Sequence, residues 1–95
     1  MENLILHVYY TCKPGMAPVF VKAVKDCGAQ AKVHAEDGCM QYDYHLSFEQ
    51  PDTVVLLERW RDAAALEKHM GQPHMGEINA LKMQDVDEVK IERYE

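Results

Sequence analysis

In this chain, the side chains best suited to acid–base chemistry are those of two histidines, His69 and His74. An unperturbed imidazole titrates at about 6.5, close to cellular pH, so either ring can serve as a general base. His69 falls at the end of a helical pattern, where a cation would also interact favourably with the helix dipole. His74 follows Pro73 at the start of the next helix, where a cation would gain nothing from that dipole. Both histidines are therefore candidates for a catalytic base, and the pattern does not choose between them.

A second group of side chains is suited to binding a flat ring or to placing a charge beside it. Tyrosine and tryptophan rings can line an apolar slot and stack on an aromatic ligand, although a tryptophan in a strand also suits the core. Glu58 shares a strand face with Trp60, so its carboxylate must either pair with a cation or lie in a pocket with a raised pKa. The candidate ligand-binding residues are Tyr42, Tyr44, His45, Glu58 and Trp60.

Neither a metal centre nor a disulfide framework is expected. A metal site would need His7, His45 and a helical histidine to converge, which their spacing does not require. His69 and His74 straddle a break, so they are not the rigid one-turn pair of a helical zinc motif. The cysteines are odd in number and contain no CxxC pair, which argues against disulfides and structural zinc. We expect reduced thiols, with Cys27 packed in the core as a small apolar residue.

Regular elements must position these residues, and their patterns can be followed along the chain. Alternating or apolar runs predict strands, and apolar residues at three- and four-residue steps predict helices. Asp62 is a suitable N-cap, Gly71 a suitable helix end, and Pro73 fits a first helical turn. Strands are predicted over 4–10, 39–48, 53–60 and 86–94, and helices over 17–36, over 63–70 and from residue 73. The order βαββαβ predicts one α+β, ferredoxin-like domain over residues 1–95, with a four-stranded antiparallel sheet.

The predicted strand 53–60 indicates a homodimer. It is apolar on both faces, with Val54 and Leu56 opposing Val55 and Leu57. Helices cover only one face of a ferredoxin-like sheet, and a chain of 95 residues has no further element for the other. A large exposed apolar face usually marks an interface, so we expect two copies to pack sheet against sheet.

Composition excludes several classes of partner. The formal net charge is −6, from 10 Lys and Arg against 16 Asp and Glu, and no basic run could neutralise phosphates. Nucleic acid and anionic membranes are therefore not expected as partners. No apolar stretch approaches the roughly 20 residues that span a bilayer, and the start MENLILHVYY lacks the features of a signal peptide. A cytoplasmic location is the default expectation.

Four stretches together carry a family resemblance: GC-x-x-Y, QPDTVVLLERW, ALEKHM and QPHM, in that order after a βα start. The chain resembles the antibiotic biosynthesis monooxygenase family, and the quinol monooxygenase branch most. The resemblance implies a dimeric α/β barrel with a pocket between sheet and helices in each protomer. For this chain we expect no cofactor. Members include oxygenases of polycyclic phenols and quinols, haem-degrading enzymes and an isomerase of a phosphorylated signalling sugar, so membership alone does not define the reaction.

The residues favour a cofactor-independent monooxygenase of a small aromatic quinol or polyphenol. A deprotonated quinol can itself donate an electron to dioxygen, so the protein needs a base, an apolar slot and a donor that steadies the anion. Haem degradation is disfavoured because the first strand lacks the asparagine of those relatives, and His69 stands where their tryptophan is expected. Two alternatives remain: an isomerase of a small oxygenated metabolite, and a non-catalytic dimeric barrel that binds a small ligand.

Overall fold

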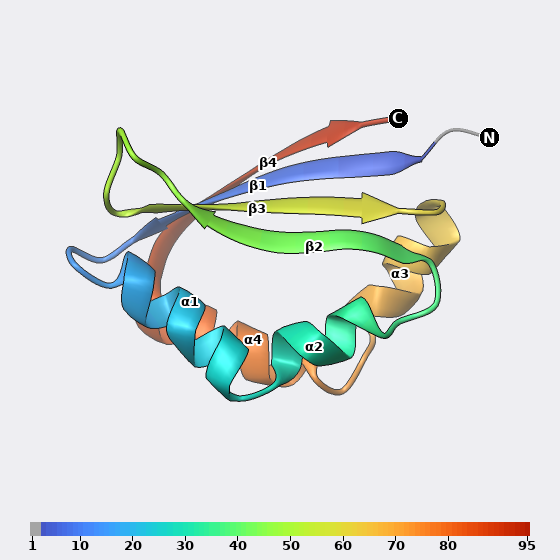
Figure 1. The fold of residues 1–95 in the computed structure, drawn as a ribbon, viewed down its shortest axis with the longest axis horizontal. Coiled ribbons are helices and arrows are strands. Elements are labelled where there is room, and N and C mark those ends of the chain that lie inside the picture. The colour runs from blue at the N-terminus through green and yellow to red at the C-terminus, as the bar shows by residue number, and fades with distance from the viewer. Residues whose placement is uncertain (1–2) are drawn as a thin grey trace.

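Four helices lie along one face of a four-stranded antiparallel sheet and leave the other face uncovered (Figure 1). The structure is a computed structural model that describes residues 3–95, so residues 1 and 2 of the predicted domain lie outside it. The strands are ordered β2-β3-β1-β4, which confirms the predicted ferredoxin-like α+β fold. In chain order the elements are β1 (Leu4–Cys12), α1 (Ala17–Asp26), α2 (Ala29–His34), β2 (Cys39–Leu46), β3 (Thr53–Trp60), α3 (Ala63–Met70), α4 (Met75–Asp85) and β4 (Val86–Tyr94).

The single helix predicted over 17–36 is wrong, because the chain breaks it into α1 and α2. Gly28 adopts a φ of 82°, a left-handed conformation that ends regular helix, and α2 then stops at His34. Cys27 becomes the C-cap of α1 and is exposed, so its predicted place in the core is wrong as well. The break has a larger consequence further along, because Glu36 leaves the helix and enters the loop before β2.

The helix-facing side of the sheet holds the core. Even-numbered residues of β1 and β3 point towards the helices, as the two-residue period of a strand requires. Phe20 and Val24 of α1, Val33 of α2 and Ile78 of α4 pack onto them. The buried apolar residues of β1 and β3 are Leu4, Leu6, Val8, Tyr10, Cys12, Val54, Leu56 and Trp60. This core anchors α1, α2 and α4 to the sheet, whereas α3 contributes Ala65 and Leu66 near the end of β3.

The opposite side, called the open face here, is made by the odd-numbered residues of β1 and β3. Ile5, His7, Tyr9, Val55 and Leu57 are all half-buried there. No helix of the described residues packs on this face (Figure 1). The two-sided apolar character predicted for β3 is therefore present, with one side in the core and the other on the open face. Within residues 3–95, every helix is too short or too polar to cross a membrane.

Gly38 is the position where backbone freedom and space both matter, and it lies two residues after Glu36. Replacing Gly38 by alanine should destabilise the fold more than replacing Gly28. Both glycines have positive φ, 88° and 82°, so alanine costs about 1–2 kcal/mol at either. A Cβ at Gly38 would also lie 2.5 Å from the Cβ of Ala65, whereas nothing lies within 4 Å at Gly28. Overpacking of this kind costs roughly a further 1–3 kcal/mol.

Chemical denaturation of the two variants measures this difference. We expect the loss in free energy of unfolding to be about twice as large for Gly38→Ala as for Gly28→Ala. Equal losses would show that the loop around Gly38 relaxes freely and does not depend on close packing against α3.

Candidate active site

His69 lies near the end of α3, buried against two aromatic rings. α3 begins directly after β3, and Asp62 caps it by accepting a hydrogen bond of 2.9 Å from the backbone N–H of Ala65. This confirms the predicted cap and fixes the direction of the helix. The imidazole of His69 has its centroid 4.5 Å from that of Trp60 and 5.4 Å from that of Tyr42. The ring is thus held between the end of β3 and the middle of β2.

A carboxylate, Glu36, joins the two predicted histidines. Its Oε2 lies 2.9 Å from Nδ1 of His69 and 2.7 Å from Nε2 of His74. The side chains of His69, Glu36 and His74 are 3%, 8% and 10% exposed, so water screens these contacts little. The backbone of Glu36 is also held, because its N–H donates to Val33 and its carbonyl accepts from Cys39. We call His69, Glu36 and His74 the histidine cluster.

The hydrogen bonds of the histidine cluster select a tautomer for His69. A carboxylate only accepts hydrogen bonds, so the ring nitrogen that faces it carries the hydrogen. Nδ1 of His69 therefore donates to Glu36, which leaves Nε2 as the basic nitrogen of the neutral ring. Among the residues described, no side chain hydrogen-bonds to this Nε2, and His69 also lines a cavity. The arrangement suits a base that takes a proton from a molecule in that cavity.

The cavity lies between the sheet and helices α3 and α4, where the helices leave β4 uncovered. Its volume is about 270 Å³. Apolar side chains form most of its wall, with tyrosine, carboxyl and cationic groups placed among them. The residues that line it are Leu6, Val8, Tyr10, Tyr42, Glu58, Leu66, His69, Met70, Met75, Lys82, Val89, Ile91 and Arg93. An apolar slot with a few polar groups is the usual form of a small-molecule site.

Glu58 and Lys82 place opposite charges in the cavity wall. Burial raises the pKa of the Glu58 carboxyl, although the Trp60 N–H, at 2.9 Å from Oε1, and the nearby His69 and Lys82 favour its charged form. Burial also lowers the pKa of Lys82, against the attraction of Glu58. The Nζ of Lys82 lies 5.5 Å from the centroid of the Tyr10 ring. A cation that is only partly solvated, facing an apolar slot, can stabilise an anion bound there.

Tyr42 and Tyr44 have different relations to the cavity. Both are buried, and burial raises the pKa of each phenol, so both stay neutral near neutral pH. Tyr42 lines the cavity and contacts His69. Tyr44 donates a long hydrogen bond of 3.5 Å to the Tyr42 hydroxyl and packs edge-on against Phe20. Tyr42 is thus placed to contact a ligand, while Tyr44 supports it from behind.

His45, the remaining candidate, lies apart from the others. It is exposed and pairs in register with Val55, whose side chain belongs to the open face. The structure therefore brings together Tyr42, Glu58, Trp60, His69 and His74 of the predicted residues, and it does not bring His45 to the histidine cluster. The alternation of β2 already places His45 opposite Tyr42 and Tyr44.

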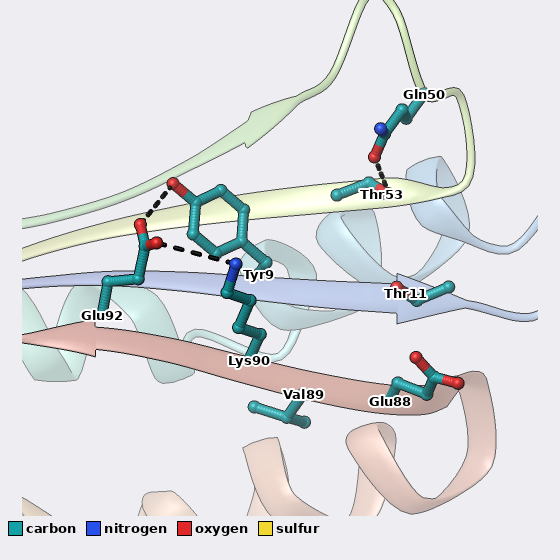
Figure 2. Close-up of a pocket in the computed structure, with 8 residues that line it drawn as sticks. All are labelled: Tyr9, Thr11, Gln50, Thr53, Glu88, Val89, Lys90 and Glu92. Carbon is teal, nitrogen blue, oxygen red and sulfur yellow. Dashed lines mark hydrogen bonds and ion pairs between the residues drawn. The ribbon is translucent and has the colours of Figure 1, made fainter.

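The open face carries a hollow of a different character (Figure 2). This sheet hollow has a volume of about 450 Å³ and lies over β1 and β4. The Tyr9 hydroxyl donates to Glu92 at 3.0 Å, and Lys90 forms an ion pair with the same carboxylate at 3.7 Å. Tyr9, Lys90 and Glu92 are therefore paired with one another, whereas Nε2 of His69, which lines the cavity on the other side of the sheet, has no hydrogen-bond partner among residues 3–95.

Sequence reasoning missed Glu36 and Lys82, although each left a signal. Glu36 was predicted at the C-terminal end of a helix, where a carboxylate opposes the dipole and therefore needs another partner. Lys82 follows Ile78 by four residues, which places it on the apolar stripe of its helix. Among residues 3–95, no group of three or more His, Cys, Asp or Glu side chains is arranged to hold a metal ion.

Comparisons with known proteins agree on one family. A model of the antibiotic biosynthesis monooxygenase family matches residues 3–81. The Bacillus subtilis protein named putative monooxygenase YcnE is 30% identical over 71 residues, covering 75% of this chain and 73% of that protein. The Mycobacterium tuberculosis protein named putative monooxygenase Rv0793 is 48% identical over 40 residues, which span 42% of this chain but only 39% of the relative.

Solved structures extend the likeness to nearly the whole chain. The structure of Rv0793 superposes with a TM-score of 0.82 at 26% identity, covering 99% of this chain and 94% of that one. The crystal structure of PA3566 from Pseudomonas aeruginosa has a TM-score of 0.86 at 30% identity, covering 99% and 93%. The shared fold therefore includes the elements that build the cavity.

Replacing Glu58 by glutamine should stabilise the protein at neutral pH and not at acidic pH. Burial raises the folded-state pKa of Glu58 above its unfolded value, so between these two values the folded state binds more protons. The free energy of unfolding of the wild type therefore falls as pH rises between these two pKa values. The glutamine variant does not ionise, so its stability does not fall in this range, and its side-chain oxygen can still accept the hydrogen bond from the Trp60 N–H. We expect a gain of about 1–3 kcal/mol at neutral pH.

Thermal unfolding across pH measures this effect. The advantage of Glu58→Gln should close as pH falls to about 4, where the unfolded carboxyl is itself protonated. Glu49→Gln, at an exposed carboxylate, serves as the matched control and should show no such trend. An advantage that is equal at all pH values would contradict a raised pKa at Glu58.

Proposed function

Because the chain belongs to the antibiotic biosynthesis monooxygenase family, we propose that it is a cofactor-independent monooxygenase that oxidises a small aromatic quinol or polyphenol. One observation carries the proposal: His69 is buried beside an apolar cavity, oriented by Glu36 and backed by Trp60 and Tyr42. A base held in this way can take a phenolic proton in a place from which water is largely excluded.

The chemistry needs only the substrate, dioxygen and the base. The substrate hydroxyl gives its proton to His69, and the electron-rich anion transfers one electron to dioxygen. The semiquinone radical and superoxide then combine at a ring carbon that bears hydrogen, and His69 returns the proton to form a hydroperoxide. The ring carbon that carries the hydroperoxide then loses its own hydrogen as a proton while the O–O bond breaks. A carbonyl group remains on that carbon, and the proton and the released hydroxide form water. One quinol and one dioxygen thus yield one hydroxyquinone and one water, without an external reductant.

The remaining cavity residues have roles that follow from their charge and shape. Lys82 steadies the substrate anion, since its ammonium group faces the same slot as His69. Tyr42 contributes a flat wall to the slot, and Trp60 supports the ring of His69 from the side. The cavity volume of about 270 Å³ is near the lower end for ligand pockets, roughly 300–1,000 Å³. We therefore favour a substrate of one or two rings.

We propose that two copies of the chain form a homodimer by packing their open faces together. Ile5, Val55 and Leu57 are half-buried there, with no helix above them in the part of the chain that is described. Association of two such faces would remove this apolar surface from water. The cavity lies between the sheet and helices α3 and α4, on the side of the sheet away from the open face, so a homodimer of this kind does not place the partner over it.

Oxygen consumption tests the proposed function. Purified, metal-free protein is mixed with a panel of reduced quinones and polyphenols, and autoxidation is subtracted. His69→Gln should lower kcat/KM for the best substrate by at least about 100-fold, because a general base contributes roughly 10²–10⁴. His45→Gln, at the exposed histidine, should retain full activity; fold and oligomeric state are checked for both variants.

The same experiment separates the alternatives. Full turnover by a folded His69→Gln protein would contradict the role of His69. Product formed without oxygen uptake would indicate an isomerase, and saturable binding without turnover would indicate a binding protein.

Lys82→Met tests the donor that steadies the anion. Loss of the nearby positive charge makes ionisation of the bound substrate harder, so the acid limb of the pH profile should move to higher pH. We expect kcat, which reports ionisations in the bound complex, to fall about tenfold at neutral pH and to recover as pH rises, since one pKa unit corresponds to a factor of ten. Lys22→Met, at an exposed lysine of α1, is the control. A loss that is uniform across pH would show that Lys82 acts only through packing.

A further inference from the structure

The histidine cluster contains two rings that can carry positive charge but only one carboxylate to balance it. Oε2 of Glu36 contacts both rings, at 2.9 Å and 2.7 Å. All three side chains are at least nine-tenths buried. One imidazolium beside the carboxylate gives a neutral cluster, whereas two would leave an uncompensated charge away from water, which is strongly unfavourable.

The two histidines face different spaces. His69 lines the cavity proposed for the substrate. Glu36 and His74 line a separate depression, which we call the loop hollow, with a volume of about 250 Å³. The other residues of the loop hollow are Lys32, Ala35, Asp37, Ala65, Lys68 and Gln72. Five of the eight lining side chains are charged or amide groups, so this space is suited to water rather than to an aromatic ring.

We propose that His69 and His74 share a single positive charge opposite Glu36, and that substrate binding moves this charge from His74 to His69. When His69 takes the phenolic proton, it becomes the imidazolium that Glu36 balances. His74 then gives up a proton to the loop hollow, so one proton reaches solvent while the cavity stays occupied. When His69 hands its proton to the peroxide, His74 takes a proton back from water in the loop hollow and carries the charge again. This inference rests on the proposed function for its substrate, but the single shared charge is a property of the free protein.

Other charged groups surround the histidine cluster. Lys32 and Glu77 form an ion pair at 3.8 Å, and Asp37 pairs with Arg61 at 3.1 Å, so each of these charges has its own partner. Lys68 is exposed on the loop hollow. Glu58 and Lys82 line the cavity together with His69. The Cys39 thiol is influenced by Glu36: burial, and after it the Glu36 carboxylate, raise the pKa of this thiol to about 11. None of them contacts both histidines as Glu36 does.

Histidine-labelled protein observed by nitrogen NMR tests the shared charge directly, without any substrate. Ring nitrogen shifts report whether each imidazole is neutral or charged. Over the whole pH range in which the protein stays folded, the rings of His69 and His74 should never both be charged. The ring signals of His7 and His45, outside the cluster, serve as internal references. Two cluster rings that are charged together would overturn the proposal.

A pH indicator in weak buffer tests the transfer of charge. Under anaerobic conditions at about pH 6.5, mixing with naphthalene-1,4-diol should release up to one proton per bound ligand from the wild type. The comparison with His74→Gln is made at a pH where nitrogen NMR shows its His69 ring to be neutral and the wild-type cluster to be charged; this variant should bind the diol and release none, since the diol proton stays on His69. Release that is equal in the two proteins would contradict the transfer.

Glu36→Gln removes the balancing charge, and Asp37→Asn is its matched control, a neighbouring carboxylate that is largely exposed. In Glu36→Gln both cluster histidines should remain neutral at pH values where the wild type carries one charge, whereas Asp37→Asn should match the wild type. If Glu36→Gln fails to fold, the wild-type titration and His74→Gln still decide the question. A diol that does not bind refutes the proposed substrate, while the titration of the free protein judges the shared charge separately.

Discussion

The contact of one buried carboxylate with two histidines determines how the cavity is built. Glu36 comes from the loop after α2, His69 from the last turn of α3, and His74 from the residue that precedes α4. Their hydrogen bonds tie together three segments that are distant in the sequence. The break at Gly28 and the turn at Gly38 bring Glu36 to this position. Without that loop geometry, the carboxylate would continue the helix and the two rings would lack a common partner.

The two sides of the His69 ring have different surroundings, one polar and the other apolar. On one side, Nδ1 faces a carboxylate; on the other, the ring borders a cavity walled mainly by aliphatic side chains. Neutral phenols, a carboxyl with a raised pKa and a lysine with a lowered pKa show how strongly burial acts on this part of the structure. A base in such a place can remove a proton without competing water, and the anion formed is then exposed to dioxygen. The family relationship and this local chemistry point to the same class of reaction.

Local sequence patterns correctly predicted the elements whose boundaries depend on nearby residues. The bounds of β3, α3 and β4 agree with the predicted ranges, because β3 is continuously apolar, Asp62 caps α3, and Gly71 ends it. The path of the chain between residues 26 and 39 could not be predicted in the same way, since a glycine within an apolar helical pattern can either be tolerated or break the helix. Glu36 became recognisable only through its partners, which lie 33 or more residues away in the sequence. Lys82 became recognisable only through the packing of α4. His45 was predicted as a ligand-binding residue from its chemical type, although the alternation of β2 separates it from the histidine cluster.

The structure of the protein with naphthalene-1,4-diol, determined from crystals grown without oxygen, would show whether His69 meets a hydroxyl group of a ligand in the cavity. We expect the diol ring in the cavity against Tyr42, with one hydroxyl oxygen within about 2.7–3.2 Å of Nε2 of His69 and with Nδ1 of His69 still bonded to Glu36. A diol bound instead in the sheet hollow beside Tyr9 and Lys90, or in the cavity with neither hydroxyl near His69, would contradict this expectation.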